Sequence, residues 1–191
     1  MSITGIGEFP SLATDRVRLR APQIDDAEPF FALLSIPEVT QFSNWPDAPR
    51  RSQVERFVRW MAKLYPSGKG CAWIVEDVTS ETVIGAVRFN RFEKKWRYGV
   101  IGYELHPTFW GRGLMTEALG VVVPCGHQAF RLNRIEAWTL RGNVASERVL
   151  EKTGFQYEGT LRQRAWFKGT FHDLRMFGRL VGGPMSAATK P

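Results

Sequence analysis

The sequence has few of the residues that build disulfide or metal sites. There are two cysteines and three histidines among 191 residues. Cys71 and Cys125 are far apart in the chain, which argues against a disulfide framework and favours a reduced, cytoplasmic protein. The histidines at positions 106, 127 and 172 have no metal-ligand spacing, so we expect no metal site.

Long apolar runs and several well-known motifs are absent as well. No stretch approaches the roughly 20 apolar residues of a transmembrane helix, and the first residues lack the pattern of a secretory signal. We therefore expect no membrane partner. There is no Gly-Lys-Ser/Thr triplet and no Gly-x-Ser-x-Gly elbow. A dinucleotide-binding Gly-x-Gly-x-x-Gly fingerprint would need a third glycine at position 116, but the residue there is Thr116. These absences argue against P-loop nucleotidases, α/β-hydrolases and Rossmann dehydrogenases.

Basic residues outnumber acidic ones. With 26 Lys+Arg against 19 Asp+Glu, the net charge is +7 and the pI is about 9.8. Residues 131–179 hold ten of the basic residues and five of the acidic ones, so the excess lies mostly in the second half. Such a balance indicates an anionic partner, which can be nucleic acid, an acidic membrane or a phosphate-bearing ligand.

Length and composition predict one globular domain. We expect an N-terminal segment at 1–11, a domain at 12–181 and a flexible tail at 182–191, where small residues, glycine and proline dominate. Hydrophobic spacing predicts strands at 15–20, 71–76, 83–90, 97–105, 134–140, 155–160 and 171–180, and helices at 25–34, 52–64, 114–129 and 144–153. The order βααβββαβαββ is that of an α/β (α+β) domain with a single sheet.

Three local details accompany this pattern. The stretch 35–50 holds three prolines and is expected to be irregular. Ser52 and Glu55 form a capping-box pattern at the start of the second helix. Pro124 is expected to kink the third helix, because an interior proline removes a backbone hydrogen bond.

A glycine-containing turn follows the strand at 97–105 and opens the helix at 114–129. Gly111 and Gly113 allow the backbone to approach a ligand, and Arg112 between them adds positive charge. Free N–H groups at a helix start, together with the positive end of the helix dipole, attract anions. The turn is therefore a candidate phosphate site, although glycines also occur in ordinary turns.

Two segments resemble the GNAT N-acetyltransferases. Residues 110–115, Trp-Gly-Arg-Gly-Leu-Met, resemble the acetyl-coenzyme A loop Gln/Arg-x-x-Gly-x-Gly/Ala. Residues 143–155, Asn-Val-Ala-Ser-Glu-Arg-Val-Leu-Glu-Lys-Thr-Gly-Phe, resemble the family's Asn-x-x-Ala/Ser…Lys-x-Gly-Phe helix. Segments 14–20 and 101–103 also match. The whole, about residues 12–180, is similar to the ribosomal-protein alanine/serine N-acetyltransferase branch.

The loop departs from the family pattern at two positions. Trp110 replaces Gln/Arg, as is common in this branch, and Met115 replaces the last Gly/Ala. We expect Met115 to narrow the space near the phosphates and to leave its own N–H available. Coenzyme binding should survive both changes, because the contacts are made by the main chain.

The resemblance implies a single GNAT-like domain in which two parallel strands, 97–105 and 134–140, splay apart in a mixed central sheet and hold acetyl-coenzyme A. No metal is implied. The coenzyme-binding residues implied by the resemblance are Leu105, His106, Trp110, Gly111, Arg112, Gly113, Leu114, Met115, Thr116, Asn143, Ser146, Arg148 and Lys152.

The resemblance also implies direct attack of an amine on the thioester within a ternary complex. A backbone N–H near Leu105 or His106 is the expected oxyanion donor. Ser146 stands where this branch has the acid that protonates the leaving thiolate. Without the resemblance, Ser146 reads as a first-turn hydroxyl that bonds the backbone, and Asn143 reads as a helix N-cap.

The general base is less well defined. Counting from Ser146, the glutamate used in this branch falls on Ala165. Glu104 and Glu158 are the remaining candidates, and each can instead simply pair with an arginine. A water chain is a further route. A weak base favours α-amines, whose pKa is about 8, over lysine at about 10.4.

The sequence leaves three functions open. The first is acetylation of a protein N-terminus, as on ribosomal proteins, and the second is acetylation of a small-molecule amine. The third is a non-catalytic RNA-binding module, to which the missing glutamate at 165 gives weight. The phosphate turn favours a coenzyme over nucleic acid as the anionic partner, with ribosome association still open. The sequence is compatible with either a monomer or a homodimer. Candidate acceptor-binding residues are Phe42, Trp45, Trp60, Trp96, Arg162, Arg164, Trp166 and Phe167.

Overall fold

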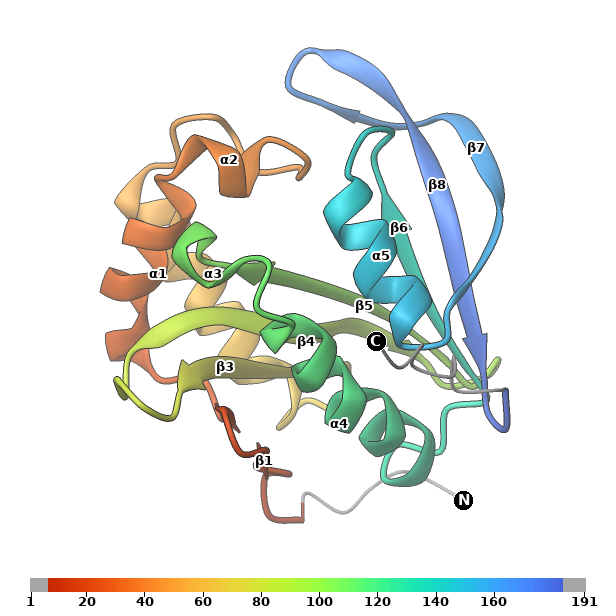
Figure 1. The fold of residues 1–191 in the computed structure, drawn as a ribbon, viewed down its shortest axis with the longest axis horizontal. Coiled ribbons are helices and arrows are strands. Elements are labelled where there is room, and N and C mark those ends of the chain that lie inside the picture. The colour runs from red at the N-terminus through yellow and green to blue at the C-terminus, as the bar shows by residue number, and fades with distance from the viewer. Residues whose placement is uncertain (1–6, 184–191) are drawn as a thin grey trace.

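A computed structural model describes residues 7–183, in which eight strands form one mixed sheet (Figure 1). The sheet order is β1-β2-β3-β4-β5-β6-β8-β7. The strands are β1 (Leu12–Ala13), β2 (Val17–Arg20), β3 (Cys71–Asp77), β4 (Val83–Glu93), β5 (Tyr98–Leu105), β6 (Arg134–Thr139), β7 (Gln156–Phe167) and β8 (Thr170–Leu180). The helices are α1 (Ala27–Leu34), α2 (Pro37–Thr40), α3 (Arg51–Leu64), α4 (Leu114–Gln128) and α5 (Val144–Lys152), with 3₁₀ turns η1 (Ile24–Asp26) and η2 (Pro107–Phe109).

The sheet is antiparallel except where β5 meets β6. These two strands run parallel and pair over only three positions, the last being Val100 with Glu136. Beyond that point they separate, while β5 stays paired with β4 as far as Leu105 and β6 stays paired with β8 as far as Thr139. The predicted fold class and its splayed parallel strands are therefore confirmed.

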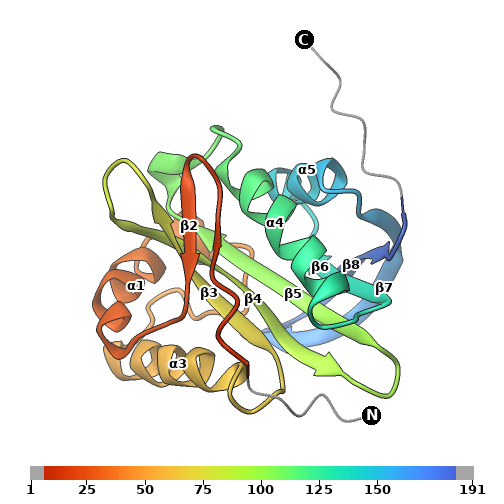
Figure 2. The ribbon, with the colours of Figure 1, turned by 90° about the horizontal axis from the view of Figure 1, so that it is seen from below.

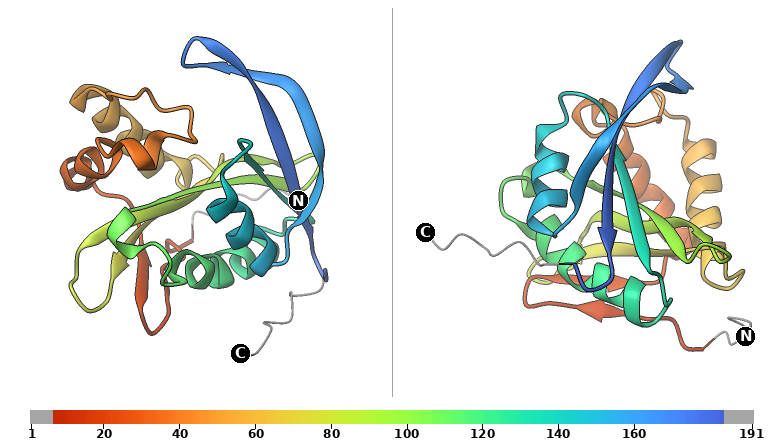
Figure 3. Two further views of the ribbon diagram at one scale, coloured as in Figure 1. Left: turned by 45° about the horizontal axis from the view of Figure 1, so that its top comes forward. Right: turned by 90° about the vertical axis from the view of Figure 1, so that its right-hand side faces the viewer.

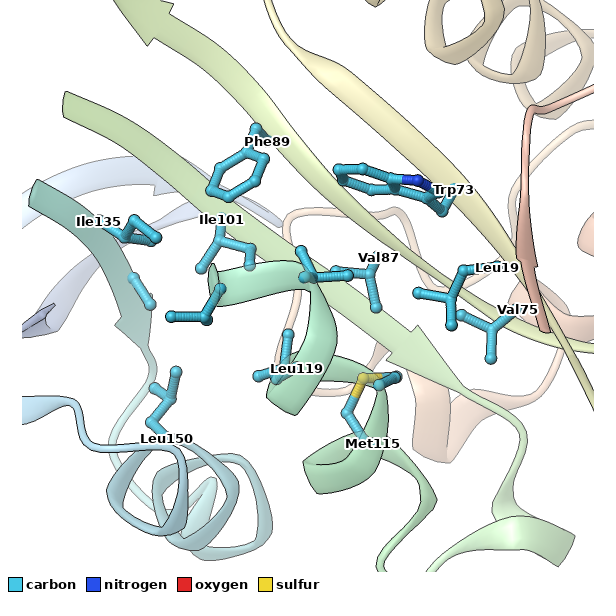
Figure 4. Close-up of a cluster of buried hydrophobic side chains, with 14 of the residues drawn as sticks. Leu19, Trp73, Val75, Val87, Phe89, Ile101, Met115, Leu119, Ile135 and Leu150 are labelled. Atoms are coloured by element: carbon cyan, nitrogen blue, oxygen red, sulfur yellow. The ribbon is translucent and has the colours of Figure 1, made fainter. Parts of the chain in front are cut away.

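Helices cover both faces of the sheet (Figure 2). On one face, α1 and α3 pack over Ala72, Ile74 and Ala86 in one hydrophobic cluster. On the other face, α4 and α5 pack in a second cluster that contains Trp73 and Phe89 (Figure 4). Neighbouring residues of β3 and β4 thus enter opposite clusters, as the alternation of side chains along a strand requires.

Helix α3 shows why the apolar spacing in the sequence was informative. Val54, Val58, Met61 and Leu64 recur every three or four residues, and each is at most 3% exposed. This spacing places them on one side of the helix, where they contact the sheet. The helix starts at Arg51, one residue earlier than predicted.

The predicted capping box at the start of α3 is wrong. Ser52 and Glu55 lie inside the helix, and the backbone N–H of Arg50 donates to the Gln53 side chain at 2.8 Å. Pro124 lies within α4, which continues through it to Gln128.

Two further segments differ from the prediction. The stretch expected to be irregular contains the single-turn helix α2, which begins at Pro37, where proline suits a first helical position. Strand β7 extends to Phe167, so that β7 and β8 form a long hairpin instead of two short strands joined by a loop. Of the predicted tail 182–191, all but Gly182 and Gly183 lies outside the described residues.

The tip of the β7–β8 hairpin reaches back to the first third of the chain (Figure 3). The Lys168 ammonium donates to the carbonyl oxygen of Thr40 at 2.8 Å and forms an ion pair with Asp47 at 2.6 Å. These partners flank residues 42–46, which are part of the connection between α2 and α3. The C-terminal hairpin therefore contacts that part of the connection on both sides.

Residues 7–183 include no helix that is both long and apolar enough to cross a membrane. In the same part of the chain, no group of three or more His, Cys, Asp or Glu residues is arranged to hold a metal ion.

Two glycines of α4 provide a matched test of its packing. A Cβ on Gly126 would lie 2.6 Å from the Phe89 ring and 3.0 Å from Ile135, whereas a Cβ on Gly120 would meet nothing within 4 Å. We expect Gly126→Ala to destabilise the fold by roughly 1–3 kcal/mol through overpacking. Gly120→Ala should be neutral or stabilise it by up to about 1 kcal/mol through helix propensity. Urea unfolding of both variants measures the difference, and equal effects would contradict the packing described here.

Candidate active site

The turn before α4 presents unsatisfied N–H groups. Gly111 and Gly113 have φ angles of +73° and +77°, which glycine adopts without a Cβ penalty. The first backbone bond of α4 runs from Glu117 N–H to Gly113 O at 3.0 Å. The N–H groups of residues 114–116 therefore have no acceptor within the helix. A Cβ at Gly111 would meet nothing within 4 Å, so the turn has room for a ligand.

Arg16, the residue before β2, contacts this turn. Its guanidinium donates to the carbonyl oxygen of Arg112 at 3.0 Å and to the Glu117 carboxylate at 2.7 Å. Arg112 itself lies over the Phe109 ring, with 5.1 Å between the guanidinium carbon and the ring centroid. The backbone of the turn is thus held by Arg16, which fits an anion site that binds through main-chain N–H groups.

Met115 does not occupy the outer surface of the candidate phosphate turn, contrary to expectation. Its side chain is 4% exposed and points into the core beside Leu119 and Val87 (Figure 4). Leu114 is buried as well. Both residues can therefore offer only their backbone N–H groups to a ligand, and the substitution of the family's Gly/Ala leaves the outer surface of the turn open.

The end of β5 offers one unpaired N–H toward β6. Leu105 lies opposite Gly85, and the N–H of His106 donates to Ile84 O at 2.8 Å. Because successive N–H groups of a strand point to opposite edges, the Leu105 N–H points away from β4, toward the gap between β5 and β6. Of the two expected oxyanion donors, the structure therefore favours Leu105. Trp110 Nε1 fixes this peptide by donating to Leu105 O at 2.7 Å.

A cavity of about 550 Å³ opens where β5 and β6 separate. Its walls come from the α2–α3 connection, α3, β4, β5, β6 and the first turns of α5. The aromatic residues that line it are Phe42, Trp45, Phe57, Trp60, Tyr103 and Trp138. The sequence had singled out three of these as acceptor residues, Phe42, Trp45 and Trp60. Trp96 and Trp166 are more than 60% exposed and do not line the cavity.

Two hydroxyl groups meet in this cavity. The Tyr103 hydroxyl of β5 lies 2.7 Å from Ser146 Oγ, at the start of α5, and 3.2 Å from the Ser146 carbonyl oxygen. Burial raises the pKa of the Tyr103 phenol above its usual range, so the phenol stays protonated. Ser146 thus lines the cavity, and its hydroxyl contacts another side chain, which differs from the first-turn backbone bond considered above.

The cavity also contains one buried ion pair. Both oxygens of Glu104 accept hydrogen bonds from the Arg88 guanidinium, one of them at 2.7 Å. Arg88 also donates to Asn90 Oδ1 at 2.9 Å and lies over the Phe57 ring. The alternative interpretation of Glu104, pairing with an arginine, is therefore correct. Both carboxylate oxygens are engaged by Arg88, so neither is free to contact a substrate amine.

Glu158 is not part of the cavity. It binds Arg134 at the opposite end of β6, with one contact at 2.8 Å, and it does not line the cavity walls. Arg134 lowers the pKa of the Glu158 carboxyl. Its position and its partner both speak against the expected base role. Ala165 lies in the β7–β8 hairpin, paired with His172.

The remaining predicted residues lie on α5. Asn143 is the N-cap, and its Oδ1 accepts from the Ser146 N–H at 3.2 Å, so the simple capping interpretation holds. Arg148 and Lys152 are exposed. Glu147 anchors the helix through Arg175 of β8, at 2.7 Å.

Three further residues line the cavity and were not predicted from the sequence: Arg88, Asn90 and Trp138. A usable signal existed for the first: Arg88 and Glu104 lie on adjacent antiparallel strands, opposite Gly102 and Ala86. Alternation places both side chains on one face, at diagonal positions. The pairing of Tyr103 with a residue 43 positions later on another element carried no such signal.

Comparisons with known proteins match this chain to a family of acetyltransferases. A family profile described as an acetyltransferase (GNAT) domain matches residues 16–156. The uncharacterized N-acetyltransferase YoaA of Bacillus subtilis (strain 168) is 37% identical over 169 residues, covering 88% of this chain and 96% of that protein. The ribosomal-protein-serine acetyltransferase of Escherichia coli (strain K12) is 23% identical over 171 residues, covering 88% and 94%.

Among solved structures, the ribosomal L7/L12 alpha-N-protein acetyltransferase RimL in complex with coenzyme A superimposes with a TM-score of 0.80. It is 22% identical to this chain, and the match covers 88% of this chain and 96% of that one. This similarity shows a shared fold.

The two glutamates provide a stability test of their ion pairs. Glu104→Gln leaves the charge of buried Arg88 unbalanced, so we expect a loss of about 3 kcal/mol. Glu158→Gln should cost about 1 kcal/mol or less, because this pair is partly exposed. The lowered pKa of Glu158 means that its contribution is present above the ordinary glutamate pKa and disappears as the pH falls through the folded-state value.

Urea unfolding at pH 7 and at about pH 3.5 measures both effects, the lower pH being chosen below the ordinary glutamate pKa. The stability difference between the wild type and Glu158→Gln should shrink at the lower pH. Equal costs for the two variants at pH 7 would contradict the difference in burial.

Proposed function

The chain belongs to the GNAT acetyltransferase family, and from this premise we propose that it acetylates the α-amine of a protein N-terminus, with ribosomal proteins as the first candidates. The donor is acetyl-CoA. The observation that carries the proposal is the cavity between β5 and β6, which gathers the Ser146 and Tyr103 hydroxyls beside the end of β5. The name of one structural neighbour, a ribosomal L7/L12 alpha-N-protein acetyltransferase, supports this choice of acceptor.

The coenzyme phosphates are assigned to the turn before α4. Residues 111–116 offer main-chain N–H groups there, and Arg112 adds positive charge. Arg148 and Lys152 are exposed on α5, which contacts α4, so they add to the positive charge on this side of the molecule. The amide group of Asn143 retains two N–H donors for the pantetheine carbonyls, since only its oxygen is used for capping.

The acetyl group is transferred directly to the amine. Cys71 and Cys125 do not line the cavity, so no thiol is positioned there to carry the acetyl group. The Leu105 N–H stabilises the oxyanion of the tetrahedral intermediate, a contribution of about 10²–10³ in rate for one such donor. Ser146 Oγ then protonates the departing thiolate.

The charge balance of the cavity selects the acceptor. Its only charged lining residues within 7–183 are Arg88 and Glu104, which neutralise each other. A polyamine would bring a second cation with no carboxylate to meet it, and a free amino acid would bring a carboxylate with no available cation. A peptide N-terminus with uncharged first residues has neither problem. Its α-amine, with a pKa near 8, also needs less help from a base than lysine does.

A small apolar amine is the second candidate, and the aromatic walls formed by Trp45, Phe57 and Trp60 favour it. Membership of an enzyme family counts against the non-catalytic RNA-binding module.

A panel of acceptors tests the proposal. Release of free thiol from acetyl-CoA is followed with peptides that carry ribosomal-protein N-termini, N-acetylated versions of the same peptides, spermidine, free amino acids and small aromatic amines. We expect the free peptides to react and the blocked ones not to. Reaction with aromatic amines alone would support the second candidate. Absence of thiol release with every amine would refute both.

Replacement of Ser146 tests the acid role. Ser146→Ala should lower kcat by about 10²-fold, in line with loss of a general acid, with little change in the KM for acetyl-CoA. Ser67→Ala is a matched control, because the Ser67 hydroxyl bonds only the Leu64 carbonyl at the end of α3. Steady-state kinetics with the best acceptor of the panel measures the effect. An unchanged kcat in Ser146→Ala would remove Ser146 from the chemistry.

A further inference from the structure

The described part of the cavity wall contains no side chain that is available as a base. There is no histidine, aspartate or cysteine in it, and both oxygens of its one glutamate, Glu104, are bound by Arg88. Yet the amine nitrogen must lose a proton when it becomes an amide, and the sulfur must gain one. If both atoms meet in this cavity, as the proposed function requires, a neutral connection between them removes the need for a base.

The hydroxyls of Tyr103 and Ser146 form such a connection. They lie 2.7 Å apart, within the range of a strong O–H···O hydrogen bond, and both residues line the cavity. Each hydroxyl can donate one proton and accept another. The two groups come from different elements, β5 and α5, and α5 is fixed in place by the contact of Glu147 with Arg175.

Resting on the proposed function, we propose that Tyr103 is a catalytic residue that carries the amine proton to Ser146, so that the two hydroxyls form a proton wire from nitrogen to sulfur. The amine arrives neutral, as RNH₂. Its lone pair forms the C–N bond, and the C–S bond breaks with its electron pair on sulfur. The N–H proton passes to Tyr103 Oη, the Tyr103 proton passes to Ser146 Oγ, and the Ser146 proton passes to sulfur. Amide and thiol result, and both hydroxyls are restored.

The surroundings of Tyr103 suit a relay and disfavour a free phenolate. Burial raises the pKa of its phenol, which opposes full loss of the proton. A relay avoids that loss, because each oxygen gains a proton as it gives one up. The charged groups of the cavity do not intervene, since Glu104 and Arg88 project from the other face of the sheet and bind each other. Tyr103 instead belongs to the face covered by α4 and α5.

Single-turnover rates test the wire without interference from product release. Enzyme in excess over acetyl-CoA is mixed with the best peptide or amine of the acceptor panel, and acetylated product is quantified after rapid quenching. Tyr103→Phe should slow transfer by about 10²-fold, a size typical of a lost proton-transfer group. Tyr157→Phe is the matched control, because its hydroxyl also bonds another hydroxyl, Thr160 Oγ1 at 2.7 Å, but lies outside the cavity. Its rate should be unchanged.

A double variant distinguishes a wire from two independent roles. If the two hydroxyls act as one unit, Tyr103→Phe combined with Ser146→Ala should lose about as much rate as either variant alone. The rate in mixtures of H₂O and D₂O adds a readout that a structural role would not change. The wild type should show a curved dependence from more than one proton in motion, and Tyr103→Phe should lose that curvature.

Three outcomes would overturn the wire: a Tyr103→Phe rate within twofold of the wild type, losses that multiply in the double variant, or a linear isotope dependence in the wild type. A thermal shift with acetyl-CoA shows whether each variant still folds and binds the donor. If Tyr103→Phe no longer binds acetyl-CoA, the residue is structural and the wire is wrong. Inactivity of the wild type toward every acceptor would instead refute the proposed function itself.

Discussion

The separation of β5 from β6 is the constraint on which the site depends. Two paired parallel strands would use their facing N–H and C=O groups on each other, but here the pairing stops after three positions. Each strand tolerates this because its outer edge remains hydrogen-bonded, β5 to β4 and β6 to β8. The gap exposes the Leu105 N–H and allows one cavity to reach both faces of the sheet. The aromatic wall and the hydroxyl pair are arranged around this one interruption, and the turn before α4 follows the end of β5 in the chain.

Charge is handled differently on the two sides of the molecule. Arg112, in the turn before α4, and Arg148 and Lys152, on α5, are exposed. The charged residues that line the cavity within 7–183 are instead one cation and one anion, which bind each other. A buried pair of this kind contributes little net stability but becomes costly when one partner is removed. Because Arg88 and Glu104 balance each other, they add no net charge to the cavity. The proton wire proposed for the Tyr103 and Ser146 hydroxyls fits these surroundings, because neutral hydroxyls pass a proton without creating a buried charge.

Much of the fold could be predicted from the sequence, because buried apolar residues recur at the spacing of a helix or a strand. The pattern of α3 and of the strands around Trp73 and Phe89 follows directly from which side chains enter the core. The short elements β1 and α2 were not predicted, because they contain too few residues to show a repeating apolar pattern. The turn at Gly111 and Gly113 was found because positive φ angles restrict residue choice. The pairing of Tyr103 with Ser146 was not found, and Met115 was misjudged, because both depend on how α4 and α5 sit on the sheet.

The contact of Lys168 with Thr40 and Asp47 has a consequence for how the protein is made. The segment 42–46 lines the cavity, and its two ends are held by a hairpin whose second strand, β8, finishes only at Leu180. Synthesis proceeds from the N-terminus, so this wall is secured only after almost the whole described chain has left the ribosome. A partly synthesised chain that ends before Lys168 therefore lacks both contacts that hold this wall of the cavity.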